Sequence, residues 1–190
     1  MKLLGITSIL AIILFTMLLS KEQYKEPSFT LLDSKGNIEI RQYKEYIVAK
    51  TSIIKNNTNS DNNMFRVLAS YIFGRNTKNE SIPMTAPVTT FEDDNSYNML
   101  FYMLESNEIN DLPSPSGQNI TFDKFNLGKC AVIKFSWYVN DKKISKYQKR
   151  LENFINDNDY KIESPFMVNR YDSPWTLPFM RRNEVLVKIQ

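Results

Sequence analysis

The stretch Lys129-Cys130-Ala131-Val132-Ile133-Lys134-Phe135-Ser136-Trp137 decides the fold class of this chain. Every second residue from Ala131 to Trp137 is apolar, which is the period of a β-strand with one buried face. We expect Trp137 to lie on that face, so its replacement by alanine is predicted to cost about 3–5 kcal/mol of unfolding free energy. Near Asn140 the apolar period lengthens to that of an amphipathic helix, with a stripe of Ile144, Tyr147, Leu151 and Phe154.

Elements of the same kind, in the same order, come before this stretch. A strand is predicted over 120–125, directly ahead of it. Further back, alternation at 38–40 and a β-rich stretch at 46–54 predict two strands joined by a tight hairpin. An Asn-rich loop follows over 55–63. A second amphipathic helix comes next, with a stripe of Phe65, Leu68, Ala69 and Ile72, and further strands are predicted over 97–104, about 166–171 and about 184–189.

The elements thus form a hairpin, a helix and a hairpin, and this order occurs twice. Antiparallel strands with helices packed on one face are typical of the α+β class. The sequence therefore predicts an α+β domain with pseudo-two-fold symmetry, in which a distorted antiparallel β-barrel is flanked by two helices. Pro83 and Pro87 fit only an edge strand or the entrance of a strand.

The composition limits the chemistry that the chain can perform. Its 190 residues are 42% hydrophobic and 24% charged, which suits one globular domain. There is no histidine, which excludes a Ser-His-Asp triad, a two-histidine zinc site and a histidine-ligated haem. The single Cys130 excludes an internal disulfide. Net charge is only +3 and no nucleic-acid motif is present, so we predict no nucleic-acid partner. Because histidine is missing, we also predict no catalytic residues and no metal-ligand set.

The first twenty residues differ from the rest. Residues 3–19 form an uncharged apolar run between Lys2 and Lys21. As a helix this run would span about 25 Å, slightly less than the roughly 30 Å core of a bilayer. We expect residues 1–20 to form a hydrophobic helix, either a transmembrane anchor or a signal peptide, followed by a linker over 21–27 and the domain over 28–190. In both cases the domain would be membrane-anchored or exported, outside the cytoplasm.

Several segments resemble the SOUL haem-binding family. Residues 36–43, GNIEIRQY, resemble the strand that opens the family's domain, and residues 82–88, IPMTAPV, are similar to its signature. Residues 112–115, LPSP, resemble its proline-rich turn. The closing segment is similar at residues 171–175, YDSPW, and at residues 181–185, RRNEV. The resemblance covers about residues 28–190, with the segments in the family's order.

The resemblance implies a distorted β-barrel with two flanking helices. It also implies non-covalent binding of haem or a related tetrapyrrole in a shallow apolar groove, without enzymatic activity. In the family the helix that corresponds to residues 65–72 lines this groove, although the same stripe also suits the buried face of a helix. The segment 171–182 either closes the end of the barrel or forms the second wall of the groove. The candidate cofactor-binding residues are therefore Phe65, Leu68, Ala69, Ile72, Tyr171, Trp175 and Phe179.

Three other features have both a structural and a functional interpretation. Cys130 lies on the strand face opposite Ala131, which argues against a role as an iron ligand. Arg181 and Arg182 are expected to pair with backbone carbonyls, Asp172 or Glu184 rather than with propionates. The lysine-rich face of the helix after Asn140 is expected to be solvated, and contact with anionic lipid is the alternative.

Two functions remain open from the sequence. The first is transport or buffering of haem or another tetrapyrrole by a monomer, with the membrane as a partner through residues 3–19. The second is a hydrophobic-effector or protein-interaction module on the same fold, without haem. Because the chain has no histidine for the iron, burial of the porphyrin face should dominate, with Phe65, Leu68, Ile72 and Trp175 as walls. Covering ~250 Å² would contribute roughly 6 kcal/mol before association costs, which predicts micromolar or weaker affinity.

Overall fold

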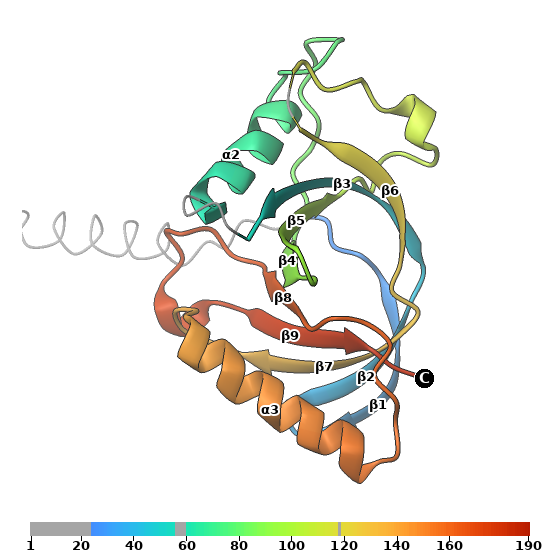
Figure 1. Cartoon of the computed structure of the whole chain (residues 1–190), viewed down its shortest axis with the longest axis vertical. Helices are drawn as coiled ribbons and strands as arrows, with labels where there is room; N and C mark the ends of the chain where they lie inside the picture. The colour runs from blue at the N-terminus through green and yellow to red at the C-terminus, as the bar shows by residue number, and fades with distance from the viewer. Residues whose placement is uncertain (1–23, 56–59, 118) are drawn as a thin grey trace, which may run out of the picture.

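The computed structural model describes residues 24–55, 60–117 and 119–190. Nine antiparallel strands form one curled sheet in the order β1-β2-β7-β9-β8-β4-β5-β3-β6, and two helices lie on its outer face (Figure 1). This arrangement confirms the predicted α+β class and the curled, barrel-like sheet. The elements are β1 (Phe29–Lys35), β2 (Ile38–Tyr43), β3 (Glu45–Ile54), α2 (Ser60–Ile72), β4 (Val88–Glu92), β5 (Ser96–Tyr102), β6 (Thr121–Asn126), β7 (Lys129–Phe135), α3 (Asp141–Asp157), β8 (Met167–Arg170) and β9 (Asn183–Lys188), with short 3₁₀ turns η1 (Ile109–Asp111) and η2 (Pro178–Met180).

The hydrophobic helix expected at residues 1–20 lies outside the described residues. Within the part of the chain that is described, no helix combines the length and the apolar composition needed to cross a membrane.

The strand order shows the pseudo-two-fold relation between the halves. The first half contributes β3, α2, β4 and β5, and the second half contributes β7, α3, β8 and β9 in the corresponding places. The two halves meet at the centre of the sheet, where β4 pairs with β8. The helices α2 and α3 therefore lie on either side of this central pair.

The two hairpins predicted at 38–54 and 120–135 are wrong. Only Lys44 separates β2 from β3, which is too short for a hairpin turn, so β2 and β3 form one long bent strand instead. That strand pairs antiparallel with the equally bent β6 and β7, and the register is unbroken across the bend, with Gln42 opposite Lys129 and Glu45 opposite Asn126. The first strand of each repeat therefore pairs with the opposite half of the sheet.

The edge strand β1 was not predicted from the sequence pattern. All seven of its residues are exposed, so they carry no alternation between apolar and polar positions. The strand pairs with β2 through a turn at Gly36, whose φ of +64° favours glycine. An edge strand without a buried face leaves no periodic signal in the sequence.

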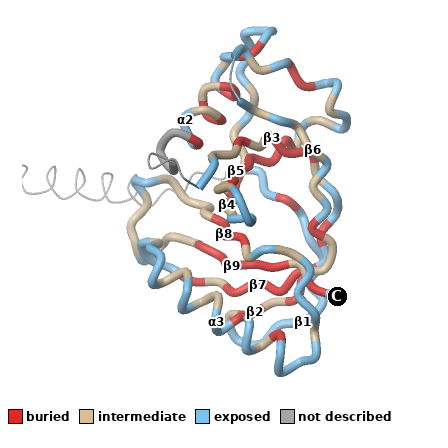
Figure 2. The backbone as a smooth tube through the Cα atoms, in the orientation of Figure 1, coloured by how far each residue is buried: buried red, intermediate tan, exposed pale blue. Residues whose placement is uncertain are grey.

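Three apolar clusters hold the fold together, two under the helices and one inside the curl of the sheet. Figure 2 shows that the buried residues concentrate on the strands. Under α3, Ile133 packs with Leu151 and Ile155, which confirms the predicted helix stripe and the buried face of β7. Cys130 and Val132 point the other way, into the interior cluster. α3 begins at Asp141, and the side chain of Asn140 accepts a hydrogen bond from the Lys143 N–H, as expected for an N-cap.

Trp137 does not lie on the buried face of this strand. β7 ends at Phe135, and Trp137 takes a left-handed φ of +79°, which turns its side chain outward so that 54% of the residue is exposed. Its N–H donates to the Pro178 carbonyl at 2.9 Å, and the Asn183 amide donates to its carbonyl at 3.0 Å. The predicted cost of about 3–5 kcal/mol assumed burial, which the structure contradicts.

We now expect Trp137→Ala to lower the free energy of unfolding by less than about 1 kcal/mol, as for other exposed positions. Urea denaturation of the variant measures this difference. Phe135→Ala is the matched control on the same strand, because Phe135 is buried and stacks on Tyr147 with ring centroids 4.3 Å apart. A loss for Trp137→Ala as large as that of the control would show that the indole is buried after all.

Candidate functional site: the cleft between the helices

The outer face of the sheet carries a cleft between α2 and α3, above the central pair of strands β4 and β8. Its volume is about 520 Å³. Figure 1 shows the two helices on either side of these strands. The lining residues are Met64, Thr90, Phe91, Glu92, Tyr97, Asn98, Asp141, Ile144, Ser145, Gln148, Phe166, Val168, Arg170 and Val185.

The floor of the cleft comes from the strands at the centre of the sheet. Alternation along β8 places Val168 and Arg170 on the same outward face. The Arg170 guanidinium donates to the Thr90 hydroxyl on β4 at 2.8 Å, which holds the positive charge on the floor. This geometry follows directly from the pairing of β4 with β8, in which Thr90 lies opposite Val168.

The walls of the cleft come from the two helices. Met64 on α2 is buried and forms one side. Ile144, Ser145 and Gln148 form the other side, because they lie within four positions of each other on α3. Phe166, just ahead of β8, completes an apolar lining next to Ile144.

The charges of the lining are mixed. Arg170 is the one cationic side chain among the lining residues, whereas Glu92 and Asp141 supply two carboxylates. Glu92 lies 3.7 Å from the Lys55 ammonium, and Asp141 is in the first turn of α3. The accessible surface of the cleft is therefore more polar than apolar, with one positive group on its floor and negative groups toward two sides.

None of the seven sequence-predicted site residues lines this cleft. Leu68 and Ile72 are buried in the cluster between α2 and the sheet, and Ala69 is also buried, so the stripe is the core face of its helix. Phe65 is 42% exposed, and its ring meets Phe101 edge-on at 5.6 Å. Whether any of them contacts a ligand stays a prediction.

The other three predicted residues do not share one surface. Tyr171 points into the interior of the sheet, where its hydroxyl donates to a Glu184 carboxylate oxygen at 2.6 Å. Trp175 and Phe179 are exposed on the connection between β8 and β9. Arg181 donates to the Thr176 carbonyl at 2.9 Å and to the Pro174 carbonyl, as expected for this arginine. The Arg182 guanidinium pairs with Glu26 instead, and it is the backbone N–H of Arg182 that donates to Asp172.

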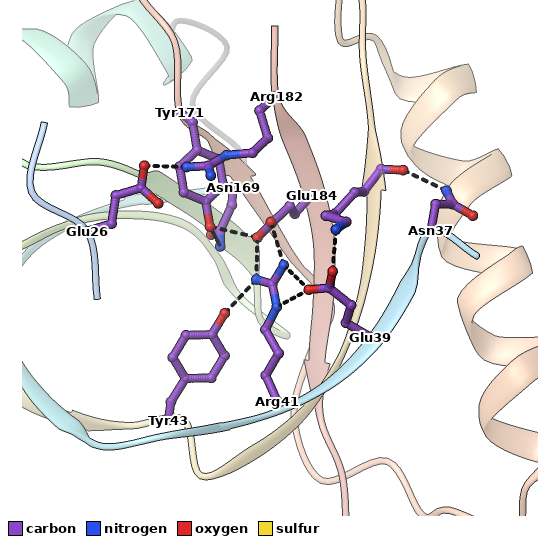
Figure 3. A network of polar contacts seen from close by, with 10 residues as sticks. Glu26, Asn37, Glu39, Arg41, Tyr43, Asn169, Tyr171, Arg182 and Glu184 are labelled. Carbon is purple, nitrogen blue, oxygen red and sulfur yellow. Dashed lines mark hydrogen bonds and ion pairs between the residues drawn. The ribbon is translucent and has the colours of Figure 1, made fainter. Parts of the chain in front are cut away.

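A buried polar cluster occupies the interior of the sheet (Figure 3). Arg41 on β2 donates to both oxygens of Glu184 on β9, at 2.9 and 3.0 Å, and to Glu39 at 2.7 Å. The Arg41 guanidinium also donates to the Tyr43 hydroxyl at 2.8 Å. Arg41 is 3% exposed and Glu184 is 1% exposed. Such a bidentate, fully partnered pair positions strands, and its acceptors are already occupied.

The environment of this cluster shifts the pKa values of its members in consistent directions. Burial disfavours the Arg41 charge, but the hydrogen bonds and charge of Glu184 outweigh it, so the pKa of Arg41 is raised. Burial and the nearby Glu184 carboxylate raise the pKa of Tyr171 well above its usual range. The Tyr171 phenol is therefore harder to deprotonate than an ordinary tyrosine, and its hydroxyl is already bonded to Glu184.

Cys130 is equally unsuited to iron. It is fully buried, its thiol donates to the Leu127 carbonyl at 3.4 Å, and burial raises its pKa to about 12. A thiol that keeps its proton binds metal poorly, because the ligand is the thiolate.

Sequence reasoning missed the residues that form the cleft. Met64 directly precedes the predicted Phe65, and Ile144 belongs to the predicted stripe of α3, so both positions carried a helical signal. Thr90 and Arg170 carried none, because a threonine and an arginine on short strands look like ordinary surface residues. Only the pairing of β4 with β8 brings them together.

Comparisons with known proteins identify a family but no individual relative. A sequence model described as SOUL heme-binding protein matches residues 24–188. No curated protein matches the chain. The crystal structure of the EcmrR C-terminal domain is similar with a TM-score of 0.60 and 12% identity, over 80% of this chain and 96% of that chain. A structure described as a hydrolase from Listeria innocua has a TM-score of 0.55 and 7% identity, over 84% of this chain and 94% of that chain. At such identities the structural likeness shows the fold alone.

Proposed function

The chain belongs to the SOUL heme-binding protein family, and from this premise we propose that it binds haem or a related tetrapyrrole non-covalently, for transport or buffering and without enzymatic activity. The cleft between α2 and α3 is the proposed site. Its volume of about 520 Å³ is the observation that carries this choice, since small-molecule pockets span about 300–1,000 Å³.

The residues of the cleft suit a tetrapyrrole in two respects. Ile144 and Phe166 offer apolar surface for the porphyrin plane. Arg170 offers a charge-assisted hydrogen bond to one propionate. Since the chain has no histidine, Tyr97 is a lining residue whose hydroxyl could approach the iron.

Titration of the protein with haemin and with iron-free protoporphyrin tests how the ligand is held. We expect one saturable site for each, with affinities within about tenfold of each other, because apolar contact rather than an iron bond dominates and 1.4 kcal/mol corresponds to one decade. The Soret shift and quenching of protein fluorescence measure the two constants. A hundredfold preference for haemin would contradict apolar binding and direct attention to Tyr97, whose replacement by phenylalanine keeps the ring and removes the hydroxyl.

A pair of variants locates the site. Ser145→Phe adds a bulky ring to the cleft from an exposed position on α3, and it should weaken haemin binding by at least about tenfold. Lys149→Phe, exposed on the same helix and outside the cleft lining, is the matched control and should bind normally. If instead Trp175→Ala weakens binding and Ser145→Phe does not, the ligand lies at the 171–182 segment and the cleft assignment is wrong.

A second candidate is a hydrophobic-effector module without haem. The two carboxylates of Glu92 and Asp141 favour it, because they outnumber Arg170 and disfavour a dicarboxylate ligand. Protoporphyrin dimethyl ester separates the two functions. Weaker binding of the ester than of the free acid supports propionate recognition by Arg170, whereas tighter binding of the ester supports an uncharged effector.

We further propose that residues 3–19 attach the domain to a membrane, with the domain outside the cytoplasm. The length and apolar character of this run, flanked by Lys2 and Lys21, support the proposal. Mass spectrometry of the mature protein tests it, since a first residue near Lys21 would identify a cleaved signal peptide instead.

A further inference from the structure

Four large aromatic side chains are exposed on two segments that contact each other, residues 137–138 and 175–179, outside the cleft. Trp175 is 91% exposed, and Phe179, Tyr138 and Trp137 are each more than half exposed. We call these four residues the aromatic rim. Large exposed apolar groups that lie together usually mark a contact with another surface. The proposed cleft does not use any of them.

The backbone under the aromatic rim is held by specific contacts. Residues 171–182 lie beside the start of α3 (Figure 1), and the Trp137 N–H donates to the Pro178 carbonyl at 2.9 Å. The Arg181 guanidinium lies 4.7 Å from the centre of the Tyr138 ring and donates to the Thr176 and Pro174 carbonyls on either side of Trp175. The two segments that carry the rim are therefore tied together through their backbones and through Arg181.

The chain enters the domain next to the aromatic rim. The Ala86 N–H donates to the Lys25 carbonyl at 2.9 Å, and the Glu26 carboxylate pairs with Arg182, the neighbour of Arg181 (Figure 3). Residues 20–24 separate this point from the apolar run that ends at residue 19. Five extended residues reach at most about 18 Å, so a tether at 3–19 keeps this end of the domain close to the bilayer.

The charges beside the aromatic rim complement a lipid surface. α3 starts three residues after Tyr138, and Lys142 and Lys146 are exposed on its first two turns. Tryptophan and tyrosine concentrate at the headgroup level of membranes, and exposed lysines are attracted to anionic lipid. These preferences distinguish a bilayer from a second copy of this basic chain, whose lysines would repel each other.

We propose that the aromatic rim rests in the headgroup region of the membrane that holds the chain, with Trp175 inserted most deeply. This inference rests on the proposed tether at residues 3–19. The tether and the rim would then be two separate attachments, which together fix the orientation of the domain on the bilayer.

Tryptophan fluorescence tests this inference directly, because Trp137 and Trp175 are the only two tryptophans of the chain. The full chain is reconstituted into vesicles of phosphatidylcholine and phosphatidylglycerol, with or without brominated acyl chains as quenchers. We expect brominated lipid to reduce the emission about twofold, since both indoles would lie at the interface. Trp137→Phe should leave the quenching of Trp175 intact.

The matched control places a single tryptophan elsewhere. Phe73→Trp, in a Trp137→Phe/Trp175→Phe background, reports from an exposed site at the far end of α2, about 20 Å along the helix from its start. Its emission should not be quenched. Equal quenching of this control and of the native tryptophans would mean that the domain contacts lipid without orientation, and would overturn the proposal.

Flotation of the same vesicles separates the failure of the rim from the failure of the tether. Protein that floats with lipid but shows unquenched emission overturns the rim contact and leaves the tether standing. Protein that does not float overturns both. A third outcome is tryptophan emission that is not quenched by brominated lipid but shifts to shorter wavelength as the protein-to-lipid ratio rises. This outcome would mean that the rim contacts a second copy of the chain, and it would also overturn the proposal.

Discussion

Replacing Arg41 by alanine should lower the free energy of unfolding by about 3–5 kcal/mol, because removal of one partner leaves a buried charge without compensation. Glu184 is 1% exposed and receives two hydrogen bonds from the Arg41 guanidinium. In the variant this carboxylate is left inside the sheet without its cationic partner. Urea denaturation followed by circular dichroism measures the loss, and a value below about 1 kcal/mol would contradict it.

Two further variants keep this prediction testable if Arg41→Ala fails to fold. The double variant Arg41→Leu/Glu184→Leu removes both charges and should recover part of the loss, while Glu39 keeps its ion pair with Lys134. Lys50→Ala breaks the more exposed pair with Asp123, at 2.9 Å, and should change stability by less than about 1 kcal/mol. Additive effects of Arg41→Leu and Glu184→Leu would show that the two side chains do not stabilise one another.

Stability should fall steeply above about pH 10, after a flat range through neutrality. Burial raises the pKa values of Tyr43, Tyr102 and Tyr171 above their ordinary range and raises that of Cys130 to about 12. The unfolded chain releases these protons near pH 8.5 for the thiol and near pH 10 for the phenols, whereas the folded chain keeps them. The stabilisation is complete below the unfolded pKa values and is lost as pH rises toward the folded ones.

Each group whose proton is retained should lower the free energy of unfolding by about 1.4 kcal/mol per pH unit in that range. Urea midpoints between pH 6 and 11 measure the slope. Tyr102→Phe should reduce the slope, whereas Tyr138→Phe, at an exposed ring, should leave it unchanged. A flat profile up to pH 11 would show that the buried phenols ionise as easily in the folded protein as in the unfolded chain.

Local patterns predicted the faces of the elements but not their partners. Alternation assigned Ile133 to the helix-covered face and Cys130 to the interior, and the structure confirms both. The same alternation does not indicate which strand pairs with which. The predicted pairing of neighbouring strands into hairpins at 38–54 and 120–135 was therefore wrong. Trp137 fits the apolar alternation of the strand although the strand ends at Phe135. Nothing in the sequence indicates that the backbone becomes left-handed at this tryptophan.

The candidate site was harder to predict than the fold, and for the same reason. The apolar stripe of α2 packs into the core. The pattern at Leu68 and Ile72 therefore reflects the packing that stabilises the fold and does not mark a ligand site. The cleft depends on Arg170 and Thr90, which meet only because β8 pairs with β4. Glu184 likewise pairs with Arg41, which lies near the start of the domain sequence, and not with the adjacent Arg181 or Arg182.

The exchange of first strands between the two halves has a consequence for biosynthesis. Ile38 pairs with Ile133, and Lys50 pairs with Thr121, so the amino-terminal half leaves the ribosome long before the strand that completes it. Contacts this distant in sequence close large loops and slow folding. Neither half can finish its sheet alone, and two fragments divided between residues 105 and 119 would gain their structure only by assembling with one another.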